Sequence, residues 1–213
     1  MRHILEAQQF QPELIELLFN RARELQSLIE DPRKHQKIGS LLAEHIMISV
    51  FFEPSTRTRI SFETAAQHLG MKVVSTENAN TSSSATKGEN LEDTIKVLCQ
   101  YKPSVIVMRH PQQASATKAA EVSSVPIINA GDGAGQHPTQ ALLDLYTIEK
   151  ELGKKSNLTV LLGCDLLHSR TSKSLIYILS LFKNNRLILV SDKNMQIDHE
   201  LRTHLENNKI NFI

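Results

Sequence analysis

The sequence predicts an α/β fold in which parallel sheets are flanked by helices. Short runs of β-branched and aromatic residues alternate along the chain with longer segments whose apolar residues recur at helical spacing. Such alternation is typical of parallel sheets, because a chain returns to the next parallel strand through a crossover that is usually a helix. The chain has 213 residues, of which 40% are hydrophobic, and this is enough to bury a core.

The elements can be placed in order from the N-terminus. An amphipathic helix is predicted over residues 12–29, which begin with a proline. Each later strand is a short apolar run, and the helices between the strands end at glycine or polar residues. The predicted strands are 46–52, 72–75, 105–108, 125–129, 158–163 and 187–190, and the predicted helices between them are 60–69, 91–100, 114–122, 137–152 and 171–182.

A boundary between two domains is predicted near residue 150. The polar segment 153–156 follows the helix 137–152 and precedes another strand, helix and strand. We therefore expect one domain over residues 1–150 and the first part of a second α/β domain over residues 151–213.

Composition and charge argue against several classes of protein. The formal net charge is +1 and the Lys and Arg residues are scattered, so we expect no nucleic-acid partner. The N-terminus lacks a basic and apolar leader, and no run reaches the roughly eighteen apolar residues of a membrane helix, which predicts a cytoplasmic protein without membrane contact. Cys99 and Cys164 lack metal-ligand spacing and are too few for a disulfide framework, so we expect two small buried residues and no metal site.

Residues 51–59 combine hydroxyls with two guanidiniums where a predicted strand gives way to a helix. A helix N-terminus has unpaired N–H groups and the positive end of the helix dipole, so it favours phosphate binding. Arg57 and Arg59 are about 200° apart around a helix and cannot both face one ligand. We assign Arg57 to the anion and Arg59 to the structure, near Glu63 on the next turn. Taken alone, the pattern fits an ordinary capped helix with solvated arginines equally well.

Residues 131–140, with the sequence GDGAGQHPTQ, repeat this design. A predicted strand precedes them, the glycines permit close backbone approach, and a helix follows. His137 and Gln140 are three residues apart, so their side chains would point together toward the strand ends; the alternative is that they only cap the helix. Neither this glycine pattern nor residues 86–88 fits a nucleotide-binding motif, which predicts a phosphate site that needs no nucleotide.

Four segments, in this order, together resemble one family. They are STRTR at 55–59, TKGE at 86–89, MRHP at 108–111 and HPTQALLD at 137–144. In order and approximate spacing they resemble the aspartate carbamoyltransferases of the aspartate/ornithine carbamoyltransferase family, and the similarity covers nearly the whole chain. The resemblance implies transfer of the carbamoyl group from carbamoyl phosphate to L-aspartate, giving N-carbamoyl-L-aspartate and phosphate in pyrimidine biosynthesis. It implies no cofactor, metal or covalent intermediate.

The resemblance also implies roles for individual residues in the carbamoyl phosphate domain. The oxyanion site would be completed by Thr58 and His137, Arg109 would contact both the phosphate and the carbonyl oxygen, and Gln140 would hold the carbamoyl NH₂ group. The resemblance thus implies three catalytic residues, Thr58, Arg109 and His137. The residues implied to bind carbamoyl phosphate are Ser55, Thr56, Arg57, Thr58, Arg109, His137 and Gln140.

The remaining implied residues concern aspartate and the neighbouring subunit. Arg170, at a predicted strand-to-helix turn, matches the arginine that binds an aspartate carboxylate, and Glu53 matches the residue that orients it. Ser83 and Lys87 match a loop that enters the active site of a neighbouring subunit, where Lys87 would also serve aspartate. The resemblance therefore implies a homotrimer, with a regulatory chain as a further candidate partner.

The resemblance predicts that the chain is C-terminally truncated. It reaches Ile213 inside the second domain, before the family's second substrate-binding arginine and glutamine. We therefore expect the 213 residues alone to be inactive.

Two alternatives stay open. Ornithine carbamoyltransferases share the Ser-Thr-Arg-Thr-Arg turn, although Lys87 and residues 142–144 favour aspartate as acceptor. The other alternative is a non-catalytic remnant that binds anions or forms oligomers.

Overall fold

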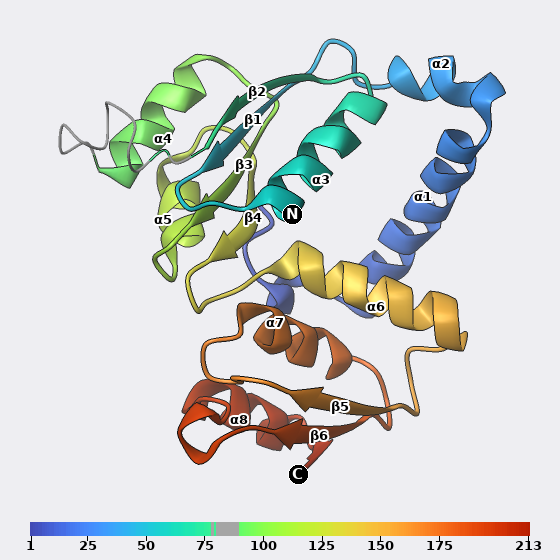
Figure 1. Cartoon of the computed structure of the whole chain (residues 1–213), viewed down its shortest axis with the longest axis vertical. Coiled ribbons are helices and arrows are strands. Elements are labelled where there is room, and N and C mark those ends of the chain that lie inside the picture. The colour runs from blue at the N-terminus through green and yellow to red at the C-terminus, as the bar shows by residue number, and fades with distance from the viewer. Residues whose placement is uncertain (78, 80–89) are drawn as a thin grey trace.

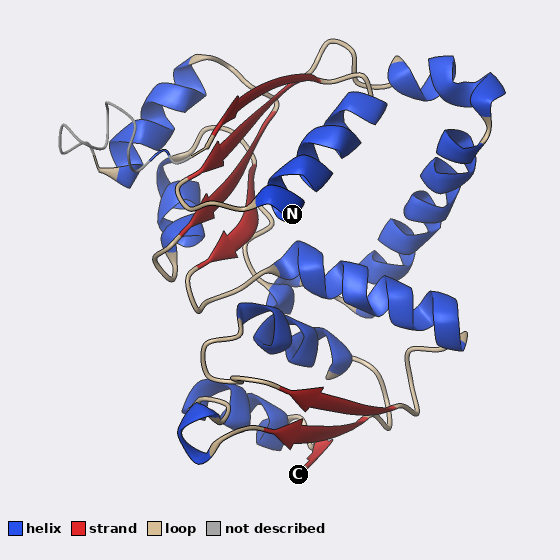
Figure 2. Ribbon diagram, viewed as in Figure 1, coloured by secondary structure: helices blue, strands red, loops and turns tan. Residues whose placement is uncertain are grey.

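The chain folds around two parallel sheets with helices packed against them (Figures 1 and 2). The computed structural model describes residues 1–77, 79 and 90–213. The strands are β1 (Ile46–Phe51), β2 (Lys72–Thr76), β3 (Val105–His110), β4 (Ile127–Asp132), β5 (Thr159–Gly163), β6 (Arg186–Val190) and β7 (Asn211–Phe212). The α-helices are α1 (Pro12–Glu30), α2 (His35–Gly39), α3 (Thr56–His68), α4 (Leu91–Gln100), α5 (Ser115–Val122), α6 (Pro138–Leu152), α7 (Arg170–Leu179) and α8 (His199–Asn207). Short 3₁₀ turns lie at η1 (Ala7–Gln9), η2 (Pro32–Lys34) and η5 (Lys193–Met195).

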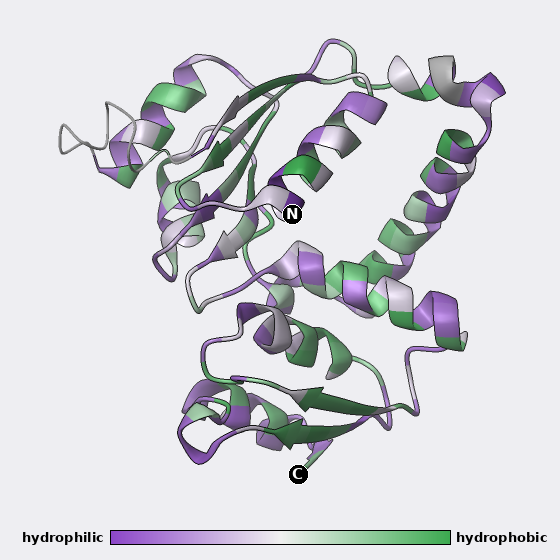
Figure 3. Cartoon of the chain, viewed as in Figure 1, coloured by the Kyte–Doolittle hydropathy of each residue, from purple (hydrophilic) through white to green (hydrophobic). Residues whose placement is uncertain are grey.

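The first sheet has the strand order β2-β1-β3-β4, and all its pairs are parallel. Along β1, Met47 and Phe51 pack with α3, whereas Ile48 and Val50 pack with α4 and α5 on the other face. This alternation follows from the two-residue period of a strand. Because both faces are covered, β1 is apolar at every position except Ser49, and Figure 3 shows hydrophobic residues along the strands of both sheets.

The N-terminal segment closes the outer edge of β4. The Ile4 N–H donates to the Ile127 carbonyl at 2.8 Å, and the Ile4 carbonyl accepts from the Asn129 N–H at 2.8 Å. These bonds satisfy backbone groups that an exposed edge would leave unpaired.

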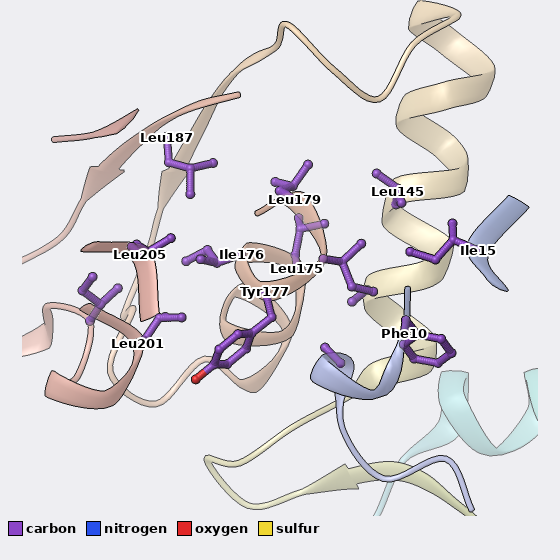
Figure 4. Packing of buried hydrophobic residues seen from close by; sticks show 14 of the residues in the cluster. Phe10, Ile15, Leu145, Leu175, Ile176, Tyr177, Leu179, Leu187, Leu201 and Leu205 are labelled. Carbon is purple, nitrogen blue, oxygen red and sulfur yellow. The ribbon is translucent and has the colours of Figure 1, made fainter. Parts of the chain in front are cut away.

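The second sheet, β5-β6-β7, is also parallel. Its core is shared with α1, η1 and α6, so the chain from the first 20 residues meets the chain after residue 170 in one hydrophobic cluster (Figure 4). Ile15 and Leu145 lie on one side of α7, while Leu187 and Leu205 lie on the other, and Ile176 of α7 is fully buried between them. The end of α6 is set by Gly153, which adopts a left-handed conformation with φ of 68°. The division into domains near residue 150 stays a prediction.

Most elements agree with the sequence, and the predicted α/β class with parallel sheets is confirmed. Helix α3 begins at Thr56, four residues before the predicted start, and α7 ends at Leu179, three residues before the predicted end. Helices α2 and α8 and strand β7 were not predicted. One residue prediction was wrong: Cys99 is buried as expected, but Cys164 is exposed, because it lies just past the end of β5. Within the described ranges, no helix combines the length and apolar character needed to cross a lipid bilayer.

Lys155 lies just after the end of α6 and contacts three other parts of the chain. Its Nζ lies 2.5 Å from a carboxylate oxygen of Glu16 on α1 and 2.5 Å from one of Glu149 on α6. The same ammonium lies 5.7 Å from the ring centroid of Phe19 and 5.9 Å from that of Phe182. Burial disfavours the charge, but the two carboxylates outweigh burial and raise the pKa of Lys155. The ammonium therefore ties α1 and α6 to the segment that follows α7.

Replacing Lys155 with alanine is expected to lower the free energy of unfolding by about 2 kcal/mol, because two carboxylates lose a partner whose side chain is only 11% exposed. Urea unfolding of the two proteins measures the difference. The matched control is Lys150→Ala, which removes an exposed ammonium from the same region and should change stability by less than about 0.5 kcal/mol. Equal effects of the two substitutions would contradict the role of Lys155.

Candidate active site

The candidate site lies where the strands of the first sheet end. The carboxyl ends of parallel strands meet at one edge of a sheet, and the turns after β1 and β4 lead from that edge into α3 and α6. A pocket of about 760 Å³ opens there. Its polar lining includes Arg57 and Thr58 of α3, Arg109 of β3, His137, Gln140 and Asp144 at the start of α6, and Arg170 of α7. The pocket thus brings together side chains that are far apart in the sequence.

The N-terminus of α3 separates the two arginines as predicted. Arg57 is exposed and lines the pocket, and in the part of the chain that the structure describes its side chain makes no hydrogen bond or ion pair. Arg59 instead donates to Ser75 at 3.3 Å and pairs with Glu77 at 3.0 Å and Glu63 at 3.6 Å. The structural assignment of Arg59 is confirmed, and Arg57 is a guanidinium available to a ligand.

The residues just before Arg57 present the helix end itself. Ser55 occupies the N-cap position of α3, but its hydroxyl makes no capping hydrogen bond, and Thr56 is the first helical residue and is exposed. The first backbone N–H groups of α3 are therefore without a side-chain cap from Ser55, which is the arrangement that favours an anion at a helix N-terminus.

Glu53 links two arginines through one oxygen. Its Oε1 accepts from Arg109 Nε at 2.5 Å and from Arg170 Nη2 at 2.9 Å. Arg109 also donates to Thr58 Oγ1 at 3.4 Å, and Arg170 donates to the Gly133 carbonyl at 3.1 Å. Burial alone would raise the pKa of Glu53, but the hydrogen bonds from the two guanidiniums outweigh it and hold the pKa below its usual range. The ionised carboxylate therefore holds the two cations at fixed positions beside the pocket.

Gly131 allows Arg170 to come close to the end of β4. A Cβ atom on Gly131 would lie 3.0 Å from both Cζ and Nε of Arg170, and the φ angle of Gly131 is +114°. Any side chain here would push against the guanidinium and strain the backbone. The glycine therefore contributes to the position of Arg170.

His137 is neutral at physiological pH. Its ring is buried, with the residue 4% exposed, and burial together with the charges of Arg170 and Arg109 lowers the pKa of His137 to about 4. Its backbone N–H donates to Ser174 Oγ of α7 at 2.8 Å, and its Nδ1 lies 3.4 Å from Thr139 Oγ1. A neutral imidazole beside two guanidiniums can donate a hydrogen bond to a developing oxyanion.

Gln140 lies one turn into α6 and its side chain is held by Asp144. Gln140 Nε2 donates to Asp144 Oδ1 at 2.8 Å, and both residues line the pocket. Sequence reasoning gave Asp144 no role, although its spacing of four residues from Gln140 on a helix is a signal for such a contact. It also missed Ser174, whose contact with His137 arises from the fold and leaves no local pattern. It did anticipate close approach at the glycines of residues 131–135, but not that Arg170 is the group that approaches Gly131.

The structure brings together most of the predicted site residues. Arg57, Thr58, Arg109, His137, Gln140 and Arg170 line one pocket, and Glu53 bonds two of them. Ser55 and Thr56 lie at the adjoining helix end, outside the lining of the pocket. Ser83 and Lys87 lie outside the described residues. The chemical roles of all these residues stay predictions.

The chain is similar in sequence to known proteins. A family model described as aspartate/ornithine carbamoyltransferase, carbamoyl-P binding domain, matches residues 2–150. The chloroplastic aspartate carbamoyltransferase of Arabidopsis thaliana is 42% identical over 209 residues, which cover 98% of this chain and 52% of the relative. The aspartate carbamoyltransferase catalytic subunit of Methanocaldococcus jannaschii is 42% identical over 212 residues, which cover 100% of this chain and 67% of the relative. The chain thus spans about half the length of the plant relative.

Solved structures agree with the sequence matches. The catalytic subunit of M. jannaschii aspartate transcarbamoylase superposes with a TM-score of 0.86 at 42% identity, covering 100% of this chain and 67% of that chain. Aspartate transcarbamoylase from Trypanosoma cruzi, in complex with carbamoyl phosphate and aspartate, gives a TM-score of 0.89 at 37% identity, covering 99% of this chain and 69% of that chain. By the extent of these matches, the chain belongs to the aspartate/ornithine carbamoyltransferase family.

Proposed function

We propose that this chain provides the carbamoyl phosphate site and part of the aspartate site of an aspartate carbamoyltransferase. The reaction transfers the carbamoyl group of carbamoyl phosphate to the amine of L-aspartate, giving N-carbamoyl-L-aspartate and phosphate in pyrimidine biosynthesis. The observation that carries the proposal is the convergence of Arg57, Arg109, Arg170 and a neutral His137 on one pocket. The complex of the T. cruzi relative with carbamoyl phosphate and aspartate supports the choice of substrates.

The phosphate is bound at the N-terminus of α3. A dianion gains from the helix dipole, from the N–H groups that follow Ser55 and Thr56, and from a bidentate contact with Arg57. Arg57 has no competing carboxylate among the described residues, so its charge is available to the ligand. This separates it from Arg59, whose charge is already paired with Glu63 and Glu77.

The carbonyl oxygen becomes an oxyanion as the aspartate amine attacks. Arg109, Thr58 and His137 are the donors proposed for it, and Arg109 also contacts the phosphate. Arg109 Nη1 and Thr58 Oγ1 lie 3.4 Å apart, so the two groups converge on one region. Preorganised donors of this kind stabilise the transition state without a metal or a covalent intermediate, and each is worth about 10²-fold to 10³-fold in rate.

The aspartate side of the pocket rests on Arg170. Its guanidinium fits a carboxylate, and its bond to Glu53 fixes its direction. By the family resemblance, Ser83 and Lys87, which lie outside the described residues, are assigned to the same site from a neighbouring subunit. The resemblance likewise suggests a homotrimer as the active assembly, with a regulatory chain as a further candidate partner. The amine must be uncharged to attack, and binding of the aspartate carboxylates orients it against the carbamoyl carbon.

The first test of the proposal is the binding of carbamoyl phosphate, the substrate assigned to the described pocket. Carbamoyl phosphate at about 100 times its Kd is expected to stabilise the 213-residue chain by about 2.7 kcal/mol, measured as a rise in Tm. An equal concentration of sulfate controls for ionic strength. No rise in Tm at millimolar carbamoyl phosphate would contradict the proposal.

The acceptor is tested with labelled carbamoyl phosphate and either aspartate or ornithine. The 213 residues alone are expected to form neither product. A chimera with the third of the M. jannaschii catalytic subunit that this chain does not cover is expected to form carbamoyl-aspartate. A folded chimera that forms no carbamoyl-aspartate would contradict the proposal.

A further inference from the structure

The direction of the Gln140 carboxamide is fixed by its neighbour on α6. Gln140 Nε2 donates to Asp144 Oδ1 at 2.8 Å, and this is the only hydrogen bond of the Gln140 side chain among the described residues. An ionised carboxylate accepts hydrogen bonds and donates none, so the amide must turn its NH₂ group toward Asp144. The carbonyl oxygen of the amide is then left without a protein partner in that part of the chain.

Among the described residues, most of the charged side chains that line the pocket are hydrogen-bond donors. Arg57, Arg109 and Arg170 line it, and a guanidinium has five N–H donors and no acceptor. Such a set matches phosphoryl and carbonyl oxygens but offers nothing to a ligand N–H. Gln140 Oε1 supplies an acceptor from α6 in the same pocket. The pocket therefore combines donors for oxygen atoms with an oriented acceptor.

We propose that Asp144 is a specificity-determining residue, which orients Gln140 so that the pocket prefers an acyl phosphate bearing an NH₂ group over one bearing a methyl group. The inference rests on the proposed function, because it takes carbamoyl phosphate as the ligand. Acetyl phosphate has nearly the same shape and charge, but a methyl group stands where carbamoyl phosphate has its NH₂. With acetyl phosphate bound, the Gln140 oxygen would lose its solvent and gain no partner, which is the situation that produces strong discrimination.

A rotated carboxamide would remove the preference. If Gln140 turned its NH₂ group toward the ligand, that group would meet the carbamoyl NH₂ as donor against donor. The carboxylate at position 144 excludes this rotamer because it cannot donate to the Gln140 oxygen. The neighbour therefore acts through Gln140 and is a positioning residue without contact to the reacting atoms.

The test compares the affinities for carbamoyl phosphate, acetyl phosphate and inorganic phosphate by calorimetric titration of the 213-residue chain. The wild type is expected to prefer carbamoyl phosphate over acetyl phosphate by about tenfold to a hundredfold. Asp144→Leu should reduce this ratio about tenfold, and the affinity for inorganic phosphate, which carries no NH₂ or methyl group, reports separately the effect of removing a negative charge from the pocket. Asp144→Asn should give an intermediate ratio, because an amide both donates and accepts and permits both rotamers of Gln140. The matched control, Glu151→Gln, removes an exposed carboxylate from the same helix and should keep the wild-type ratio.

The outcomes separate the inference from the proposed function. A wild-type ratio in folded Asp144→Asn and Asp144→Leu would overturn the role of Asp144 while leaving carbamoyl phosphate binding in place. Equal affinities of the wild type for both acyl phosphates would overturn the inference in the same way. A wild-type chain that binds none of the three phosphates would overturn the proposed function and the inference with it. If the leucine variant fails to fold, the asparagine variant alone decides, because it preserves the size of the side chain.

Discussion

Replacing Arg57 with alanine is expected to weaken binding of carbamoyl phosphate by about 10²-fold to 10³-fold. The expectation rests on the contrast between the two arginines of α3. Arg57 lines the pocket beside the helix N-terminus and has no protein partner among the described residues, whereas Arg59 is paired with Glu63 and Glu77. The loss of Arg57 therefore removes a ligand contact without leaving a buried carboxylate unpaired, so binding should fall while the Tm of the free chain stays nearly constant.

Three variants make this measurement specific. Arg57→Lys keeps the charge and loses the planar fork, so it should restore only a small part of the affinity. Arg59→Ala should instead lower the Tm of the free chain, because Glu63 and Glu77 lose their partner. Arg21→Ala, an exposed arginine on α1, should change neither property. Binding of carbamoyl phosphate to Arg57→Ala with the wild-type affinity would remove Arg57 from the site.

The separation of Arg57 from Arg59 was predictable because it depends on helix geometry alone. The angle between two residues around a helix axis is fixed by their spacing. The sequence therefore only had to show that a helix begins near Arg57, after the predicted strand. His137 and Gln140 also line one pocket, as expected, although His137 is the N-cap of α6 and not one of its helical residues. Helix periodicity thus predicted the different directions of the two arginines of α3, but it does not by itself explain the placement of His137.

Contacts between distant segments were beyond this kind of reasoning. The resemblance implied that Glu53 orients Arg170, and the structure shows the contact, but the shared bond from Arg109 to the same oxygen was not predicted. The close approach of Arg170 to Gly131 depends on how α7 packs beside the end of β4, and no sequence period reports it. The start of α3 was placed four residues late because residues 56–59 are polar, and apolar spacing is the signal that marks a helix.

A second large effect is expected in the response of stability to acid, and it depends on His137. Its pKa is about 4 in the folded chain, against the ordinary value of 6.5, because burial and the charges of Arg170 and Arg109 disfavour the imidazolium. The unfolded chain therefore takes up this proton at a higher pH than the folded chain. The stability due to the neutral ring is complete above pH 6.5, falls as the pH drops from 6.5 toward 4, and does not fall further below that range. A difference of 2.5 pKa units corresponds to about 3 kcal/mol, of which about 2 kcal/mol is lost by pH 5.

Comparison with His137→Gln isolates this contribution. The glutamine does not titrate, whereas every carboxylate and every other histidine is present in both proteins. The variant should be less stable than the wild type at pH 7.5, since glutamine replaces a buried ring. The difference in free energy of unfolding between the two proteins should fall by about 2 kcal/mol by pH 5. Urea unfolding at several pH values between 7.5 and 5 measures this difference in stability, and His68→Gln, which replaces an exposed histidine of α3, is the matched control. A difference in stability that stays constant across this range would mean that His137 takes up its proton near pH 6.5 in the folded chain, which would contradict the lowered pKa of its buried ring.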